Sequence, residues 1–187
     1  MPLNLPNLLT WLRILLIPLV IGVFYLPDAM LSGSRANLLA TVFFVVAAIT
    51  DWFDGYLARK LNQTSAFGAF LDPVADKLMV AAALIVLVDL DRTAPVIALI
   101  IIGREIAVSA LREWMAKAGK SGSVAVSFIG KFKTAFQMIA ISLLLYWEPL
   151  YGFPTQTVGH LLIDLAALLT LISMAYYLGM AAKALRP

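Results

Sequence analysis

The sequence has 187 residues, of which 62% are hydrophobic and 13% are charged, and its net charge is +3. Soluble domains carry roughly 45–50% apolar and about 25% charged residues, so this apolar surplus exceeds what one globular core would use and favours a membrane protein. The lack of cysteine excludes disulfides and thiolate sites, and the scattered basic residues form no patch for a nucleic-acid partner.

Six apolar stretches follow one another along the chain, each near the length of about 20 residues that a helix needs to span a bilayer. The predicted spans cover residues 8–26, 37–59, 72–88, 94–115, 124–147 and 158–180. Polar, glycine or proline-containing segments separate them. The sequence therefore predicts an all-α integral membrane protein with six transmembrane helices, forming a single domain over residues 1–187.

Basic residues are distributed unevenly between the two ends of these spans. The end that would hold both termini and the second and fourth loops carries most of them: Arg59, Lys60, Lys117, Lys120, Lys183 and Arg186. The opposite end has only Arg35 and Arg92. Because cytoplasmic loops are enriched in lysine and arginine, we expect both termini to face the cytoplasm.

Four aspartates interrupt the apolar pattern at helical spacings. Asp51 and Asp54 are three residues apart, and Asp72 and Asp76 are four apart, so each pair shares one face of a helix. A short polar loop joins the two predicted helices. If the helices pack antiparallel, all four carboxylates meet near the cytoplasmic border.

Four neighbouring carboxylates repel one another and are costly in or near hydrocarbon, so a positive partner is expected. Hard oxygen ligands suit Mg²⁺ or Mn²⁺. Two such ions, bridged by the four carboxylates, could stabilise the attacking and leaving oxygens of a phosphoryl displacement.

Simpler interpretations exist for single members of this group. Asp72 followed by Pro73 fits a helix N-cap with proline at the first helical position. Asp51 alone fits a solvated helix end. Gly55 and Gly68 fit close helix packing as well as the approach of a bulky ligand. None of these interpretations explains four aspartates at two helical spacings around one loop.

The segment from Asp51 to Asp76 matches the pattern D-x2-D-G-x2-A-R-x8-G-x3-D-x3-D in full. It resembles the signature of the CDP-alcohol phosphotransferases. Three more segments, residues 4–13, 103–115 and 130–134, resemble the bacterial members that use glycerol 3-phosphate as acceptor. The resemblance extends from Asn4 to about Gln137, whereas the last span is generic.

This resemblance implies the six-helix CDP-alcohol phosphotransferase fold, often as a homodimer, in the bacterial inner (cytoplasmic) membrane with the active site toward the cytoplasm. It implies transfer of the phosphatidyl group from CDP-diacylglycerol to sn-glycerol 3-phosphate, giving phosphatidylglycerophosphate and CMP for phospholipid synthesis. Asp51, Asp54 and Asp72 would be metal ligands, and Asp76 would be both a ligand and the general base.

The same resemblance places Gly55, Ala58 and Arg59 along the CDP moiety, and we count Gly68 with them as a contact to the CDP-lipid. These assignments follow from the signature positions, from which the sequence does not depart.

Further basic residues lie within apolar spans: Arg104, Arg112, Lys131 and Lys133. Arginine can clamp a phosphate with two hydrogen bonds, so these residues are candidates for a pocket that binds the acceptor's phosphate. The alternative is that they are interfacial charges or snorkelling side chains. Arg13, within the first span, is expected to face a polar cavity rather than lipid.

Three other functions remain open at this stage. A sister enzyme would use inositol phosphate, serine or phosphatidylglycerol as acceptor, although the basic residues favour a phosphorylated one. A divalent-cation transporter would need carboxylates at the midplane and broken helices. Release of CMP from CDP-diacylglycerol would distinguish an enzyme from a transporter. A purely structural membrane protein would leave the aspartates unexplained.

Overall fold

The computed structural model describes residues 5–60, 66–117 and 128–185, apart from the side chains of residues 5–7, 52, 54–60, 66, 67, 69, 128–131, 184 and 185. The described ranges contain six α-helices and one short 3-10 helix: α1 (Leu5–Gly22), η1 (Val23–Tyr25), α2 (Gly33–Lys60), α3 (Ala66–Asp89), α4 (Pro95–Lys117), α5 (Phe128–Tyr146) and α6 (Thr155–Leu185). The predicted all-α class with six helices is confirmed.

Several of these helices have the length and composition of membrane spans. Three stretches in the described part of the chain are long and apolar enough to cross a bilayer: Leu8–Tyr25, Gly33–Asp51 and Thr155–Lys183. A shorter apolar stretch, Phe132–Tyr146, lies in α5. At 1.5 Å per residue, α3 and α4 are about 35 Å long and could also span a hydrocarbon core of about 30 Å. Their charged residues therefore lie within helices of membrane-spanning length.

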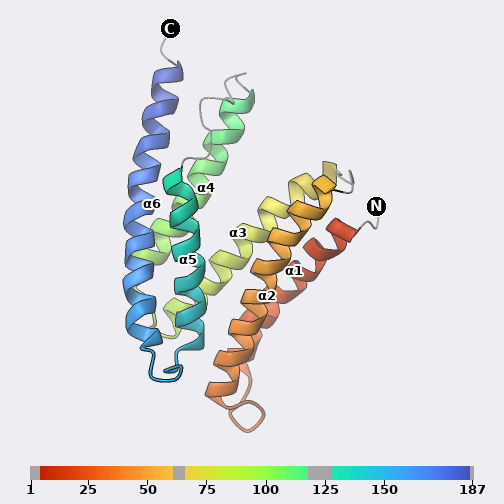
Figure 1. Cartoon of the computed structure of the whole chain (residues 1–187), viewed down its shortest axis with the longest axis vertical. Coiled ribbons are helices and arrows are strands. Elements are labelled where there is room, and N and C mark those ends of the chain that lie inside the picture. The colour runs from red at the N-terminus through yellow and green to blue at the C-terminus, as the bar shows by residue number, and fades with distance from the viewer. Residues whose placement is uncertain (1–4, 61–65, 118–127, 186–187) are drawn as a thin grey trace.

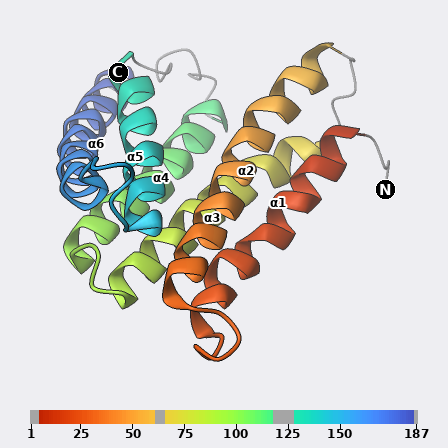
Figure 2. The ribbon, with the colours of Figure 1, turned by 60° about the horizontal axis from the view of Figure 1, so that its bottom comes forward.

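The helices form two groups of three (Figure 1). One group contains α1, α2 and α3, with α1 packed on both of the others, and the second contains α4, α5 and α6, with α6 packed on both of the others. Contacts of α2 with α5 and of α3 with α4 join the groups. Figure 2 shows the same grouping from another side. The start of α1 and the end of α6 lie at one end of the molecule, as the predicted topology requires.

Small side chains let neighbouring helices approach closely. Along α2 the buried positions recur at helical spacing: Ala36, Ala40, Phe44 and Ala47. On α6, a Cβ atom added at Gly159 would lie 2.9 Å from the side chain of Leu144 on α5, closer than real Cβ contacts allow. A larger residue at position 159 would thus require the buried Leu144 side chain to shift.

The observed start of α3 corrects one interpretation of the sequence. The helix begins at Ala66, so Asp72 and Pro73 lie in its interior and the N-cap interpretation is wrong. Proline inside a helix removes one backbone hydrogen bond, and α3 continues through it. As a consequence, Asp72 and Asp76 are one turn apart on an established helix rather than at its beginning.

Arg92, between α3 and α4, joins both helix groups at the end opposite the termini. Its buried guanidinium donates from Nη1 to the carbonyl oxygens of Leu144, at 3.1 Å, and Leu145, at 2.9 Å. These carbonyls are in the last turn of α5, where no helical N–H is available to them. Nη2 donates to Asn37 Oδ1 on α2 at 2.7 Å.

Aromatic rings enclose the same guanidinium. Its central carbon lies 4.8 Å from the ring centre of Trp147 and 5.7 Å from that of Phe24. Burial lowers the pKa of Arg92, and the Glu148 carboxylate partly offsets this effect. The sequence suggested only a loop charge here, whereas the structure shows a buried connection between α2, α5 and the α3–α4 turn.

Replacing Arg92 by methionine should therefore destabilise the fold. Three buried acceptors would lose a charged donor, and the expected loss in free energy of unfolding is about 2–4 kcal/mol. The measurement is the midpoint of heat-induced aggregation of the detergent-solubilised protein. The control is Arg35→Met, because Arg35 is an exposed arginine at the same end of the molecule. Equal midpoints for the two variants would contradict the assigned role.

Candidate active site

Aspartates from two neighbouring helices come together in the first helix group. Asp51 lies on α2, and Asp72 and Asp76 lie on α3. The Asp51 carboxylate interacts electrostatically with those of both Asp72 and Asp76. Asp54 lies on α2, but its side chain is outside the described residues. The structure thus places Asp51 within electrostatic range of Asp72 and of Asp76, the other two predicted carboxylates whose side chains it describes.

Helix α1 supplies the partners of two of these carboxylates. Arg13 is only 1% exposed, and its Nη1 lies 2.8 Å from Asp51 Oδ1. Thr10, also buried, donates its hydroxyl to Asp72 Oδ1. The two residues are three apart, so they share one face of α1. Arg13 faces the polar site as expected, whereas Thr10 was not among the predicted site residues.

The donor chemistry of this site fits a hard divalent cation. Carboxylate oxygens are preferred ligands of Mg²⁺ and Mn²⁺. The contacts from α1 reach one oxygen, Oδ1, of Asp51 and of Asp72. Among the side chains that the structure describes, no three His, Cys, Asp or Glu residues are close enough to hold an ion. A metal site here therefore needs the fourth carboxylate, Asp54, or a closer approach of the other three.

A second charged cluster lies between α4, α5 and α6. Lys133 on α5 is fully buried, and its Nζ donates to Glu105 Oε1 on α4. Arg104 Nη1 lies 3.4 Å from the same oxygen, and its Nη2 lies 3.4 Å from Ser173 Oγ on α6. Two basic residues thus share one carboxylate, which supplies the opposite charge that a buried cation needs. Glu105 was not among the predicted site residues.

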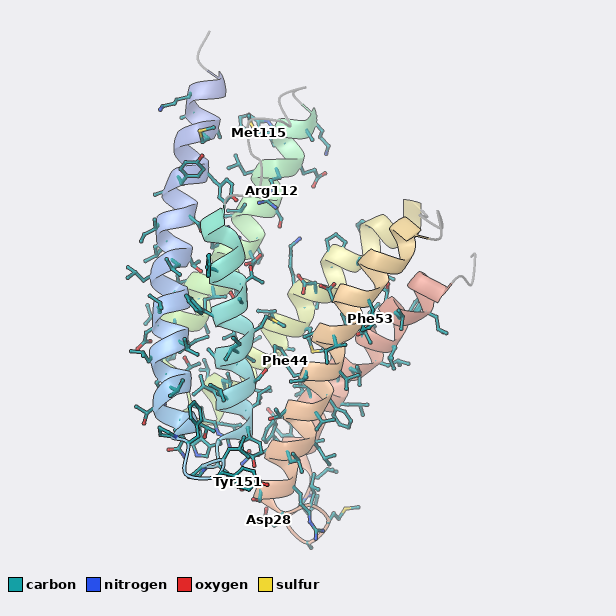
Figure 3. The ribbon with its side chains drawn as sticks, in the orientation of Figure 1. Asp28, Phe44, Phe53, Arg112, Met115 and Tyr151 are labelled. Carbon is teal, nitrogen blue, oxygen red and sulfur yellow. The ribbon has the colours of Figure 1, made fainter. Side chains whose placement is uncertain are left out.

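Arg112 lies two turns beyond Glu105 on α4. Its guanidinium carbon is 5.3 Å from the ring centre of Tyr177, and its Nη2 is 3.3 Å from the Tyr177 hydroxyl. Its buried Nε has no hydrogen-bond partner in the described part of the chain. Figure 3 shows Arg112 on α4 and Phe53, two residues after Asp51, on α2, both toward the end where the termini lie.

Several predicted contacts fall where side chains are not described. On α2 these are Gly55, Ala58 and Arg59, and on α5 it is Lys131. Gly68 is described and lies buried near the start of α3. The structure therefore does not test whether the residues predicted to contact the CDP moiety lie together.

A small cavity connects the two charged clusters. Its volume is about 60 Å³, and its lining comes from α3, α4 and α5: Asp76, Lys77, Val80, Glu105, Thr134, Gln137 and Met138. Glu105 also interacts electrostatically with Asp76. A hydroxyl group bound in this cavity would lie beside the Asp76 carboxylate, which is the arrangement that proton removal needs.

Comparisons with known proteins identify the family of this chain. The sequence model of the CDP-alcohol phosphatidyltransferase family matches residues 3–179. The chain is 50% identical over 185 residues to a protein of Salmonella choleraesuis strain SC-B67 and to one of Shigella flexneri. It is 49% identical to one of Escherichia coli strain K12. Each match covers 97% of this chain and 96% of the relative, and each relative is named CDP-diacylglycerol–glycerol-3-phosphate 3-phosphatidyltransferase.

Removing the buried cation beside Asp51 should make stability depend on metal. In chelator, Arg13→Met should lower the free energy of unfolding by roughly 1–3 kcal/mol, between the values of exposed and buried ion pairs. Excess Mg²⁺ should stabilise the variant more than the wild type, because a bound cation would replace the lost charge. The measurement is the thermal midpoint with and without Mg²⁺.

The matched control is Lys117→Met, which breaks an ion pair of 2.8 Å with Glu113 that is exposed on both sides. If Arg13→Met behaved like this control at both metal concentrations, Arg13 would have no part in balancing the aspartates.

Proposed function

The chain belongs to the CDP-alcohol phosphatidyltransferase family, and we propose that it transfers the phosphatidyl group of CDP-diacylglycerol to sn-glycerol 3-phosphate. The products are phosphatidylglycerophosphate and CMP, so the reaction belongs to phospholipid synthesis. The observation that carries this proposal is the electrostatic interaction of Asp51 with both Asp72 and Asp76, of which Asp76 lines a small polar cavity. The shared name of the full-length relatives supports this choice of donor and acceptor.

Members of the family generally depend on divalent metal. We assign two ions, Mg²⁺ or Mn²⁺, to Asp51, Asp54, Asp72 and Asp76. When bound, such ions spread the charge of the diphosphate and stabilise the attacking and leaving oxygens. Arg13 holds Asp51 in place, and the Thr10 hydroxyl orients Asp72.

Asp76 is the proposed general base. It borders the cavity where a hydroxyl of the acceptor would bind. It removes the proton of the acceptor's primary hydroxyl, that oxygen attacks the β-phosphorus of CDP-diacylglycerol, and CMP leaves. Binding both substrates side by side supplies proximity, and the fixed charges supply electrostatic stabilisation. Gly55, Ala58, Arg59 and Gly68 are the proposed contacts to the CDP-lipid.

For the acceptor's phosphate we propose Arg112, Lys131, Arg104 and Lys133. Arg112 has the strongest support among them, because within the described part of the chain its buried Nε has no hydrogen-bond partner and its Nη2 makes a long contact, 3.3 Å, with the Tyr177 hydroxyl. Lys133 and Arg104 share the Glu105 carboxylate. A phosphate that binds them must therefore either replace Glu105 as their partner or bind beside it. Their combined charge exceeds that of Glu105 and leaves the cluster positive.

The proposed location is the bacterial inner membrane, with the active site toward the cytoplasm and the protein as a homodimer. Support for the membrane comes from the apolar helices, and support for a bacterial lipid-synthesis enzyme comes from the named relatives. The basic residues near the end that holds both termini support the cytoplasmic orientation.

The function is tested with purified protein, CDP-diacylglycerol and a panel of alcohols: glycerol 3-phosphate, inositol phosphate, serine and phosphatidylglycerol. Only glycerol 3-phosphate should give both a lipid product and stoichiometric CMP. Chelation should abolish turnover, and Mg²⁺ or Mn²⁺ should restore it. The reason is that the carboxylates and the diphosphate are all negatively charged and need a cation between them. Product from another acceptor would reassign the activity, and full turnover in excess chelator would remove the two-ion proposal.

Asn substitutions should separate the base from a simple ligand. Asp76→Asn keeps the shape of the side chain but cannot accept a proton, so kcat should fall by about 10²–10⁴-fold at every Mg²⁺ concentration. Asp72→Asn should weaken metal binding, so excess Mg²⁺ should partly restore kcat. The measurement is kcat against Mg²⁺ concentration.

The control for this pair is Asp164→Asn, because Asp164 is an exposed aspartate on α6. Near-normal kcat in Asp76→Asn, or its full rescue by metal, would make Asp76 a ligand only.

A further inference from the structure

The cavity beside Asp76 contains a polar group without a partner. Gln137 on α5 is 2% exposed, and its Oε1 has no hydrogen-bond partner among the residues that the structure describes. Leaving a buried acceptor unpaired is unfavourable. Other buried atoms in the described chain also lack partners, but Gln137 is the only residue with such an atom that lines this cavity.

The surroundings of Gln137 indicate what kind of group would satisfy it. Asp76 from α3 and Glu105 from α4 line the same cavity, and Thr134 lies one turn before Gln137 on α5. Two carboxylates and an amide oxygen are acceptors, so they suit a ligand that brings O–H donors. The two carboxylates outnumber Lys77, the one cationic residue that the structure describes in the lining, so the cavity disfavours a phosphate. The cavity therefore fits the hydroxyl-bearing part of a ligand and not its anionic part.

The size of the cavity limits the ligand further. A water molecule needs about 10–15 Å³ of such space, so the cavity, at about 60 Å³, holds a few non-hydrogen atoms. This matches the two hydroxyl-bearing carbons at one end of a glycerol unit. A larger ring such as inositol would not fit without opening the helices.

We propose that Gln137 is a specificity-determining residue for the acceptor: its amide binds the secondary hydroxyl of glycerol 3-phosphate and so places the primary hydroxyl against Asp76. This inference rests on the proposed function and adds the site of the acceptor's hydroxyl end. The acceptor's phosphate then points away from Asp76, toward the positive cluster formed by Arg104 and Lys133 around Glu105. An enzyme that hydrogen-bonds a substrate hydroxyl in this way rejects analogues that lack it, because its buried polar group is then left unpaired.

The test compares two acceptors that differ only at this hydroxyl, glycerol 3-phosphate and 3-hydroxypropyl phosphate, in the wild type and in Gln137→Met. Methionine keeps the length of the side chain but cannot accept the hydrogen bond. The wild type should prefer glycerol 3-phosphate in kcat/KM by at least about tenfold. In Gln137→Met, kcat/KM should fall by about tenfold for glycerol 3-phosphate and by less than about twofold for the analogue, so the preference is lost.

Two further variants make the comparison secure. Thr170→Val is the matched control, since Thr170 on α6 is fully buried and its Oγ1 also has no hydrogen-bond partner among the described residues, but it does not line the cavity. This control should keep the wild-type preference. If Gln137→Met does not yield folded protein, Gln137→Asn withdraws the amide from the cavity while keeping its chemistry, and it should also reduce the preference.

The possible failures are distinguishable. If the wild type forms no lipid product from glycerol 3-phosphate, the proposed function itself fails. If the wild type turns over both acceptors equally well, the secondary hydroxyl has no partner and the role of Gln137 is overturned. Equal losses on both acceptors in Gln137→Met would also overturn it, because they would indicate ordered water or simple packing in the cavity.

Discussion

The ion pair between Arg13 and Asp51 offsets part of the negative charge that the aspartates gather in this protein. Several carboxylates are gathered within apolar helices, where uncompensated charge is costly. Arg13 is buried and cannot reach water, so it is a fixed counter-charge rather than a surface residue. The contact also explains why α1 packs on both α2 and α3, because one face of α1 carries the partners of both Asp51 and Asp72.

Buried charges are also paired in the second helix group, but there the excess charge is positive. Glu105 is the single carboxylate shared by Arg104 and Lys133, so that cluster keeps an excess of positive charge. The aspartates keep an excess of negative charge, even with Arg13. An acceptor that carries both a phosphate and a hydroxyl would be oriented by these two clusters before any specific contact forms. The separation of charge between the helix groups thus favours one direction of binding.

Hydropathy and spacing predicted most of the helices and the aspartate cluster, because both depend on residues close in sequence. Helix ends were predicted less accurately: α3 begins six residues before its predicted span, because Asp72 and Pro73 lie inside the helix rather than at its start. Contacts between distant segments were missed, such as Thr10 with Asp72, 62 residues later, and Arg92 with the end of α5. No local pattern distinguishes a buried Gln137 from an exposed one, because its burial depends on three helices meeting.

Helix α5 relates the two ends of the proposed acceptor site. Lys133 and Gln137 are four residues apart on one face, about 6 Å along the helix axis. Lys133 contacts Glu105, and Gln137 lines the cavity with Asp76. This spacing is comparable to the length of a three-carbon phosphate ester, so one face of α5 could meet the phosphate at one turn and the hydroxyl at the next. Glu105 contacts Lys133 and lines the same cavity as Gln137, so it joins the two ends of the proposed acceptor site. The positive charge of Arg104 and Lys133 at one end and the Asp76 carboxylate at the other favour an acceptor whose hydroxyl end reaches the base.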